Sequence, residues 1–167
     1  MITLSDELKF MARGAGLCDQ WFGEWGEPNT DELIDKFTRG IDFAIKHNFP
    51  TNEYIHEHFD TSTLRRHGVY VDDVVCVENK PFVVTQGKSV GALQFNNLAV
   101  SSVYARHDSN LTIRAIGGSK VFLRVYDNAR VRVYASPSSK VFVYRYGGEI
   151  ETDGNVIVRE RNFIAQK

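Results

Sequence analysis

Apolar and polar residues alternate from Ser101 to Gly148 in units of ten residues. The first, third and fifth places of each unit are mostly small or branched apolar residues, and the second and fourth are polar, basic or aromatic. This period of two predicts strands with one buried face, and each unit closes on turn-forming residues. The predicted inward residues are Val103, Ala105, Leu111, Ile113, Ala115, Val121, Leu123, Val125, Val131, Val133, Ala135, Val141 and Val143.

Ten-residue strand-and-turn units are typical of two folds, an antiparallel β meander or barrel and a β-solenoid with two units per coil. The similarity is stronger at a spacing of 20 than at 10, because Val121–Leu123 matches Val141–Val143 and Ser119-Lys120 matches Ser139-Lys140. Stacked coils favour such columns of like residues. We therefore expect a solenoid of roughly 20-residue coils, and the meander or barrel is the alternative.

The same period extends to both sides of the repeats. Further strands are predicted at Val69–Val71, Val75–Val77, Phe82–Thr85, Leu93–Phe95, Leu98–Val103 and Val156–Arg159, with turns at Asp72-Asp73 and Asp153-Gly154. Phe163 and Ile164 are expected to cap the end of the solenoid.

Before residue 69 the apolar spacing is helical. Helices are predicted from Ser5 as N-cap to Gly14–Gly16, within Leu17–Trp25, over Thr30–His47 behind an Asn29/Glu32 capping box, after Thr51, and over Thr61–His67. Trp21 and Trp25 are expected in the core, and a ligand cage is the alternative. The fold class is thus α+β, with a helical N-terminal unit over residues 1–68 and a repetitive β-solenoid domain over 69–167.

Charge is distributed unevenly, although the net charge is only −1. Residues 1–68 hold 7 Lys/Arg and 12 Asp/Glu, whereas Ser101–Gly148 holds 8 and 2. A basic repeat region is suited to an anionic partner or to docking on an acidic surface.

The cysteines and the apolar runs indicate where the protein resides. Only two cysteines are present, Cys18 and Cys76, which argues against a disulfide framework; we expect both to be buried and reduced. Neither a secretory signal nor an apolar run of about 18 residues is evident. We expect no membrane association and a location in the cytoplasm or in a phage particle.

Candidate chemistry is sparse. His56 and His58 are two residues apart, which places them on different helix faces rather than at a chelating spacing. His107-Asp108-Ser109 contains residue types of nucleophilic catalysis, but adjacent residues cannot form the relay, so we expect a turn in which the Asp carboxylate bonds backbone N–H groups. Gly117–Lys120 lacks the spacing of a phosphate loop and is expected at a corner. We predict no catalytic residue, metal or cofactor.

The outward positions carry the functional prediction, because aromatic and basic side chains on one exposed face can stack on and bond a ligand. The alternative is that the helical unit or a second copy covers them. The predicted outward residues are Tyr104, Arg106, Arg114, Phe122, Arg124, Tyr126, Arg132, Tyr134, Phe142, Tyr144 and Tyr146.

A resemblance rests on four segments, Gly40–Phe43, His47–Glu53, Val103–Asp108 and Lys120–Ala135. With them the chain resembles uncharacterised β-solenoid proteins of gut Bacteroidetes and their prophages. The back half is also similar in style to the polymer-forming bactofilins, whose coils are richer in glycine. Neither resemblance carries an assigned activity. The internal repeat, together with the absence of a convergent acid, base and nucleophile set, predicts a non-catalytic structural or binding protein in which a rigid solenoid serves assembly or partner binding. We expect it to be of phage or mobile-element origin. The alternative function is carbohydrate binding, which is favoured over carbohydrate processing. Single-stranded nucleic-acid binding is the third candidate. A protein partner or self-association is expected first and an anionic or glycan ligand second.

Overall fold

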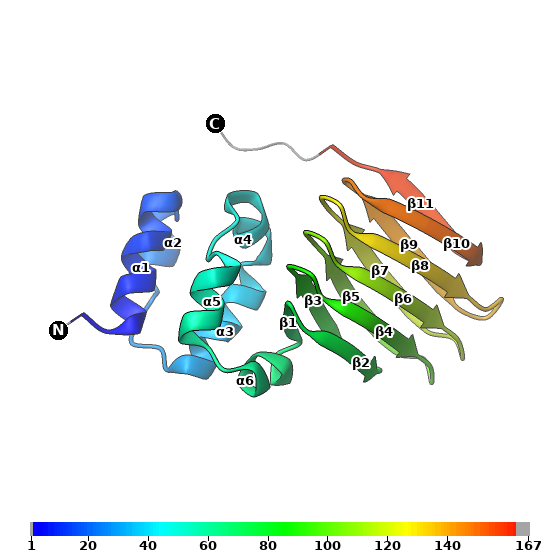
Figure 1. The fold of residues 1–167 in the computed structure, drawn as a ribbon, viewed down its shortest axis with the longest axis horizontal. Coiled ribbons are helices and arrows are strands. Elements are labelled where there is room, and N and C mark those ends of the chain that lie inside the picture. The colour runs from blue at the N-terminus through cyan, green and yellow to red at the C-terminus, as the bar shows by residue number, and fades with distance from the viewer. Residues whose placement is uncertain (1, 163–167) are drawn as a thin grey trace. The chain divides into compact units, whose positions relative to one another are not determined.

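The computed structural model describes residues 2–162, and the chain divides into two compact units with the boundary between His67 and Gly68 (Figure 1). The first unit is helical, and the second is a parallel β-solenoid of about 4 coils of roughly 20 residues. The predicted α+β fold and its solenoid are confirmed. The antiparallel alternative is wrong, because the pairings within both sheets are parallel.

The helical unit contains six helices within the described residues. They are α1 (Leu4–Ala15), α2 (Asp19–Gly23), α3 (Thr30–Arg39), α4 (Ile41–His47), α5 (Asn52–His58) and α6 (Thr61–Arg66). Their core is built from Leu8, Ala12, Leu17, Trp25 and Leu33.

Capping explains where these helices begin. The predicted capping box is confirmed: Glu32 N donates to Asn29 Oδ1 at 2.9 Å, and Asn29 N donates to Glu32 Oε1 at 3.2 Å. Ser5 was expected to cap α1, but Thr3 does so by accepting a hydrogen bond from Asp6 N. The Ser5 hydroxyl instead accepts a 2.9 Å hydrogen bond from Trp25 Nε1.

The predicted long helix over 30–47 is in fact two helices, because Gly40 interrupts it with φ −97° and ψ 28°. Glycine destabilises a helix interior by about 1 kcal/mol relative to alanine. The Trp21 ring also lies against Gly40, where an added Cβ would be 3.4 Å from the ring and 3.1 Å from Lys36 O. Gly40 therefore ends α3 and precedes α4, a break that apolar spacing alone does not reveal.

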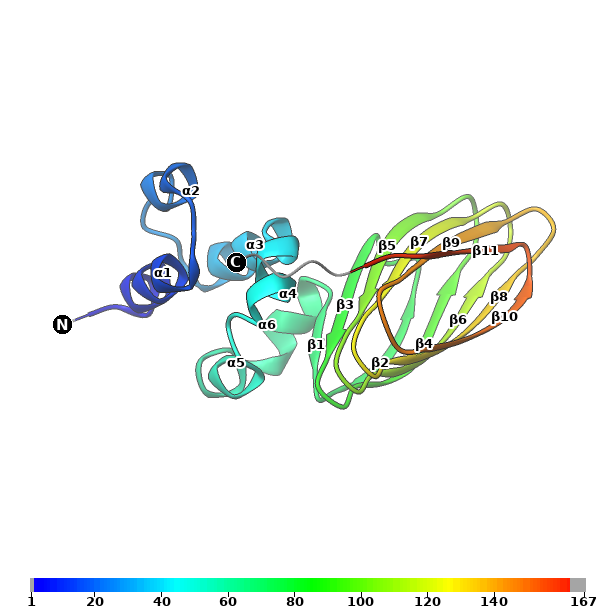
Figure 2. The same ribbon diagram turned by 90° about the horizontal axis from the view of Figure 1, so that it is seen from above.

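The solenoid consists of two parallel sheets joined by turns, seen edge-on in Figure 2. Sheet A contains β1 (Val69–Val71), β3 (Phe82–Gln86), β5 (Val100–Ala105), β7 (Lys120–Val125), β9 (Lys140–Arg145) and β11 (Val156–Glu160), in that order. Sheet B contains β10 (Glu149–Gly154), β8 (Arg130–Ala135), β6 (Asn110–Ala115), β4 (Val90–Phe95) and β2 (Val74–Glu78).

Register confirms the repeat of 20. Val121 pairs with Val141 on sheet A, and Leu111 pairs with Val131 on sheet B. The final coil is shorter, since Val141 pairs with Val156. Two details differ from the prediction: Leu98 lies in a turn rather than a strand, and Asp153-Gly154 ends β10 rather than forming the turn. Phe163 and Ile164 lie outside the described residues.

The predicted inward columns are confirmed as the core between the sheets; every member is at most 3% exposed. Burying each valine or leucine contributes roughly 1.5–3 kcal/mol relative to exposure. A further buried column occupies the ninth place of each unit, at the corners. Its members are Ser109, Ser119, Ala129 and Ser139. Serine suits this place because its hydroxyl can bond a backbone carbonyl, as Ser109 Oγ does in donating to Arg106 O at 2.7 Å.

Candidate functional site

The predicted outward residues do not form one face. Consecutive ten-residue units alternate between sheets A and B, so the residues divide among two opposite faces and one corner. On the outer face of sheet A are Tyr104, Phe122, Arg124, Phe142 and Tyr144; on that of sheet B are Arg114, Arg132 and Tyr134; at the corner are Arg106, Tyr126 and Tyr146. The prediction of a single face is therefore wrong.

The corner residues Arg106 and Tyr126 are buried, at 2% and 6% exposure, rather than outward. They hold the sixth place, where the chain leaves the strand and the alternation ends. The Arg106 guanidinium donates a hydrogen bond to Gln86 Oε1 one coil earlier, and the Tyr126 ring stacks on Tyr146 at 4.7 Å. Burial lowers the pKa of Arg106 to about 10, so this side chain is a buried cation at neutral pH. These contacts hold coils together.

The turn predicted at His107-Asp108-Ser109 is confirmed, with a left-handed His107 at φ 56°. Its hydrogen bonds link neighbouring coils: Gly87 N donates to His107 Nδ1 at 2.9 Å, and His107 N donates to Asp127 Oδ2 at 3.0 Å. Burial lowers the pKa of His107, in keeping with a neutral ring that accepts at Nδ1. The bonding carboxylate thus belongs to Asp127 on the next coil, where Asp108 was expected.

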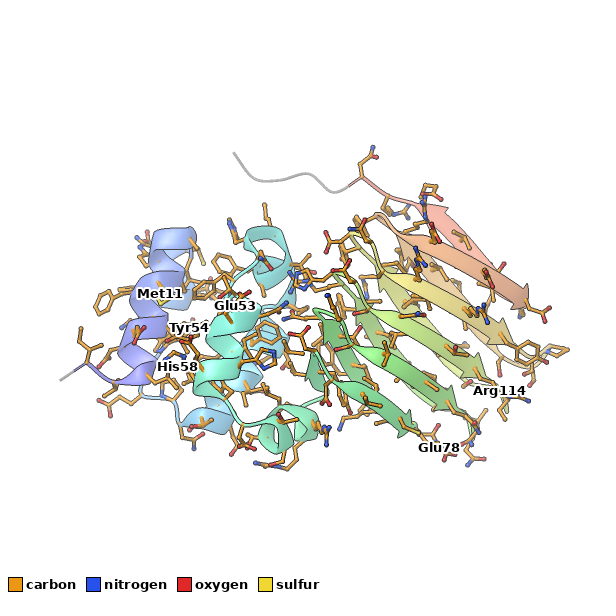
Figure 3. The ribbon with its side chains drawn as sticks, viewed as in Figure 1. Met11, Glu53, Tyr54, His58, Glu78 and Arg114 are labelled. Carbon is orange, nitrogen blue, oxygen red and sulfur yellow. The ribbon has the colours of Figure 1, made fainter. Side chains whose placement is uncertain are left out.

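The outer face of sheet B carries both signs of charge. Arg130 pairs with Glu149 at 3.7 Å, and Arg132 pairs with Glu151 at 3.2 Å. Arg114, at the arrowhead end of β6 in Figure 3, lies 5.3 Å from the centroid of the Tyr134 ring. Exposed pairs of this kind contribute only about 0–1 kcal/mol each, and they neutralise the face locally.

The outer face of sheet A is an aromatic and basic ladder that crosses the coils. The Arg124 guanidinium lies 5.0 Å from the Tyr104 ring centroid and 5.5 Å from that of Tyr144. Phe122 and Phe142 stack on each other at 5.2 Å. Tyr104 is only 8% exposed, since the Phe82 ring lies 5.7 Å away on the opposite side from Arg124. Of the predicted residues on this face, Tyr104 is therefore buried and the other four are half-buried.

The stacking determines what this face can bind. Aromatic rings stack on sugars or bases through an open ring face. Here neighbours contact these faces: Phe142 covers Phe122, and Arg124 covers the tyrosines on both sides of it. At least one face of each of these rings is therefore occupied by a neighbouring side chain, which leaves less ring surface for stacking on a ligand.

Sheet A also carries two cations that the sequence interpretation missed as site residues. Lys120 and Lys140 pair in register at the first position of β7 and β9, and Lys140 Nζ lies 5.3 Å from the Phe142 ring centroid. The outward positions of β5, β7 and β9 hold Lys120, Lys140 and Arg124 but no carboxylate. The repeated Ser-Lys pair at 119-120 and 139-140 was the available signal.

The histidines and cysteines considered as candidate reactive or metal-binding residues do not form a site in the described residues. Within residues 2–162, no three His, Cys, Asp or Glu side chains cluster so that they could hold a metal ion. His58 stacks on Tyr54 at 4.0 Å within α5, where both are labelled in Figure 3. Cys18 and Cys76 were expected to be buried, but both are exposed free thiols. Cys76 occupies an outward position of β2, which has a neighbouring strand on only one side.

Across the described residues, none of the helices combines the length and apolar character needed to cross a membrane. No protein-family model matches the chain, and no curated protein or solved structure matches it either.

Proposed function

We propose that the protein is a non-catalytic binding scaffold whose outer sheet A face docks an acidic protein partner. The observation that carries this is the combination of half-buried aromatic residues with Lys120, Arg124 and Lys140, without a carboxylate at the outward positions of β5, β7 and β9. Protein interfaces are enriched in aromatic residues and arginine. Cations that no carboxylate on the same face balances favour partners of opposite charge.

Rigidity supports the same proposal. The face is backed by a packed core and tied across coils by ring and guanidinium contacts, so little conformational entropy is lost on docking. The polar groups of the corner, including Arg106 and His107, are engaged in bonds between coils, which supports a non-catalytic role.

Docking of a second copy of this chain on the sheet A face is less favoured than docking of a different, acidic protein. Two copies of the sheet A face would bring lysines and arginines together, and like charges oppose such pairing. The terminal strand β10 also carries acids at successive outward positions, Glu149, Glu151 and Asp153, which discourages edge-to-edge stacking. Charged terminal strands protect a solenoid from polymerising.

Carbohydrate binding and single-stranded nucleic-acid binding are less favoured, because both use open aromatic faces and these rings are covered by neighbours. A location in the cytoplasm or a phage particle is part of the proposal. The exposed free thiols of Cys18 and Cys76 support a reducing compartment, and the resemblance to prophage proteins supports the phage setting.

The test uses the full chain and a fluorescein-labelled 16-residue peptide of alternating glutamate and leucine. We expect salt-sensitive binding that weakens at least tenfold in Lys120→Glu/Lys140→Glu. The matched control, Lys88→Glu/Arg114→Glu, makes the same change in net charge away from sheet A and should bind as the wild type does. Equal loss in both variants, or tighter binding of an oligothymidylate or a glycan than of the peptide, would refute the proposal.

A further inference from the structure

The helical unit contains a pocket of about 480 Å³ that the proposed function does not use. Aromatic rings from α2, the segment after α2, α3, α4 and the segment after α4 line it. They belong to Trp21, Trp25, Phe37, Phe43 and Phe49. This volume and apolar lining fall in the range of small-molecule sites, roughly 300–1,000 Å³.

The walls are held in place by packing. Trp25 is 9% exposed, and its indole N–H is bonded to the Ser5 hydroxyl. Trp21 rests against Gly40, at the break between α3 and α4, yet its side chain remains 37% exposed. One indole is thus fixed in the core, whereas the other presents surface to the pocket. The expectation that both tryptophans are core residues is correct only for Trp25.

The polar lining favours an anion. Three charged residues line the pocket, Lys36, Arg39 and Asp42. Lys36 Nζ lies 5.4 Å from the Trp25 ring centroid, and Arg39 Nε is bonded to Asp35 Oδ2 at 2.9 Å. Arg39 is thus neutralised by Asp35, and Lys36 is the cation that lies over an aromatic wall. An aromatic acid would place its ring among the aromatic side chains and its charge beside the Lys36 ammonium, which would repel an aromatic amine.

We propose that this pocket binds a small aromatic carboxylate, with Lys36 as the group that recognises its charge. The pocket volume, the aromatic lining and the position of the Lys36 ammonium over the Trp25 ring together support this ligand class. The proposal is independent of sheet A, since the lining residues all belong to the helical unit.

The chain supplies two reporters for the test. Its only two tryptophans, Trp21 and Trp25, line the pocket, so intrinsic fluorescence monitors occupancy. Cys18 also lines it, while exposed Cys76 on β2 is an internal control for alkylation by iodoacetamide. We would titrate 3-phenylpropanoate, and compare 3-phenylpropan-1-ol and 3-phenylpropylamine, which have the same ring and chain.

We expect the acid to change tryptophan fluorescence and to slow alkylation of Cys18 several-fold without affecting Cys76. Lys36→Met retains the aliphatic stem over Trp25 and should weaken the acid about tenfold, as for loss of a charge-assisted hydrogen bond, but leave the alcohol unchanged. Lys46→Met on α4 is the matched control and should bind as the wild type does. No change in either reporter, tighter binding of the amine, or full affinity in Lys36→Met would overturn the proposal.

Discussion

The rings of Phe122 and Phe142 lie 5.2 Å apart between centroids and within 8° of parallel, one coil above the other. Their positions pair in register on β7 and β9, so the repeat of 20 residues stacks like on like. A solenoid thus converts a sequence repeat into a continuous ladder, and the ladder both stabilises the coils and shapes the surface they present.

The first prediction concerns this pair. Phe122→Ala and Phe142→Ala should each lower the free energy of unfolding by about 1–2 kcal/mol, less than for fully buried phenylalanines, because both are half-exposed. The double variant should reveal a coupling of about 0.5–1.5 kcal/mol in a urea-unfolding cycle. Val100→Ala, at a 60% exposed position of the same face, is the control and should change stability little. Strict additivity of the two phenylalanine changes would show that the stacking contributes nothing.

The second prediction concerns the buried Arg106 and its partner Gln86. Gln86→Leu removes a neutral hydrogen-bond acceptor from a buried cation and should lower the free energy of unfolding by roughly 1–3 kcal/mol or more. Arg106→Met combined with Gln86→Leu should be less destabilising than Gln86→Leu alone, because no charge is then left buried. Chemical denaturation measures both variants. A double variant that is less stable than Gln86→Leu would contradict this account of the corner.

The third prediction uses two glycines in opposite situations. A Cβ at Gly91 would lie 1.8 Å from Val75 O, so Gly91→Ala must displace backbone in the first coils and should cost several kcal/mol, roughly 3 or more. A Cβ at Gly14 in α1 would meet nothing within 4 Å, so Gly14→Ala should stabilise the helical unit by about 0.5–1 kcal/mol. Thermal unfolding followed by circular dichroism tests both variants. Gly91→Ala should lower the unfolding temperature and Gly14→Ala should raise it, and a change in the same direction for both would contradict the prediction.

The fourth prediction is a pH dependence of the helical unit. Asp60 is the N-cap of α6, and its pKa is lowered from the ordinary 3.8 to about 2. The main cause is the hydrogen bond that its carboxylate accepts from the Thr63 hydroxyl, and the hydrogen bond from the Ser62 hydroxyl adds to it. A lowered pKa in the folded state means that the ionised form contributes stability above pH 3.8, and that this contribution is lost as the pH falls toward 2. Helical circular dichroism of Asp60→Asn should depend less on pH in this window than that of the wild type. Glu27→Gln, an exposed control, should follow the wild type.

The inward columns were predictable because an alternation of period two is dictated by strand geometry and does not depend on distant contacts. Val121, Leu123 and Val125 could thus be assigned to the core from the sequence alone, and the repeat at 20 selected the solenoid. The pattern failed where the strand ends. Arg106 and Tyr126 continue the alternation in sequence, yet the chain turns at the sixth place and carries them inward.

The division of the outward residues between two faces could not be read from residue types, because it follows from the way the coil places successive units on opposite sheets. Tyr134 and Tyr144 look equivalent in the repeat, but they lie on sheets B and A respectively. The lysines at 120 and 140 were overlooked because they directly follow turn residues. In the helical unit, Gly40 broke a helix whose apolar stripe continues without interruption, since the contact with Trp21 is not a local property of the sequence.

The most direct test of the sheet A face is lysine acetylation read by mass spectrometry, with and without the glutamate–leucine peptide. Lys120 lies on the proposed interface, whereas Lys88 lies in a turn at the corner after β3; both are exposed. If the acidic partner docks on sheet A, the peptide slows acetylation of Lys120 and Lys140 several-fold and leaves Lys88 unchanged. Equal protection of all three lysines, or protection of Lys88 alone, would contradict the account.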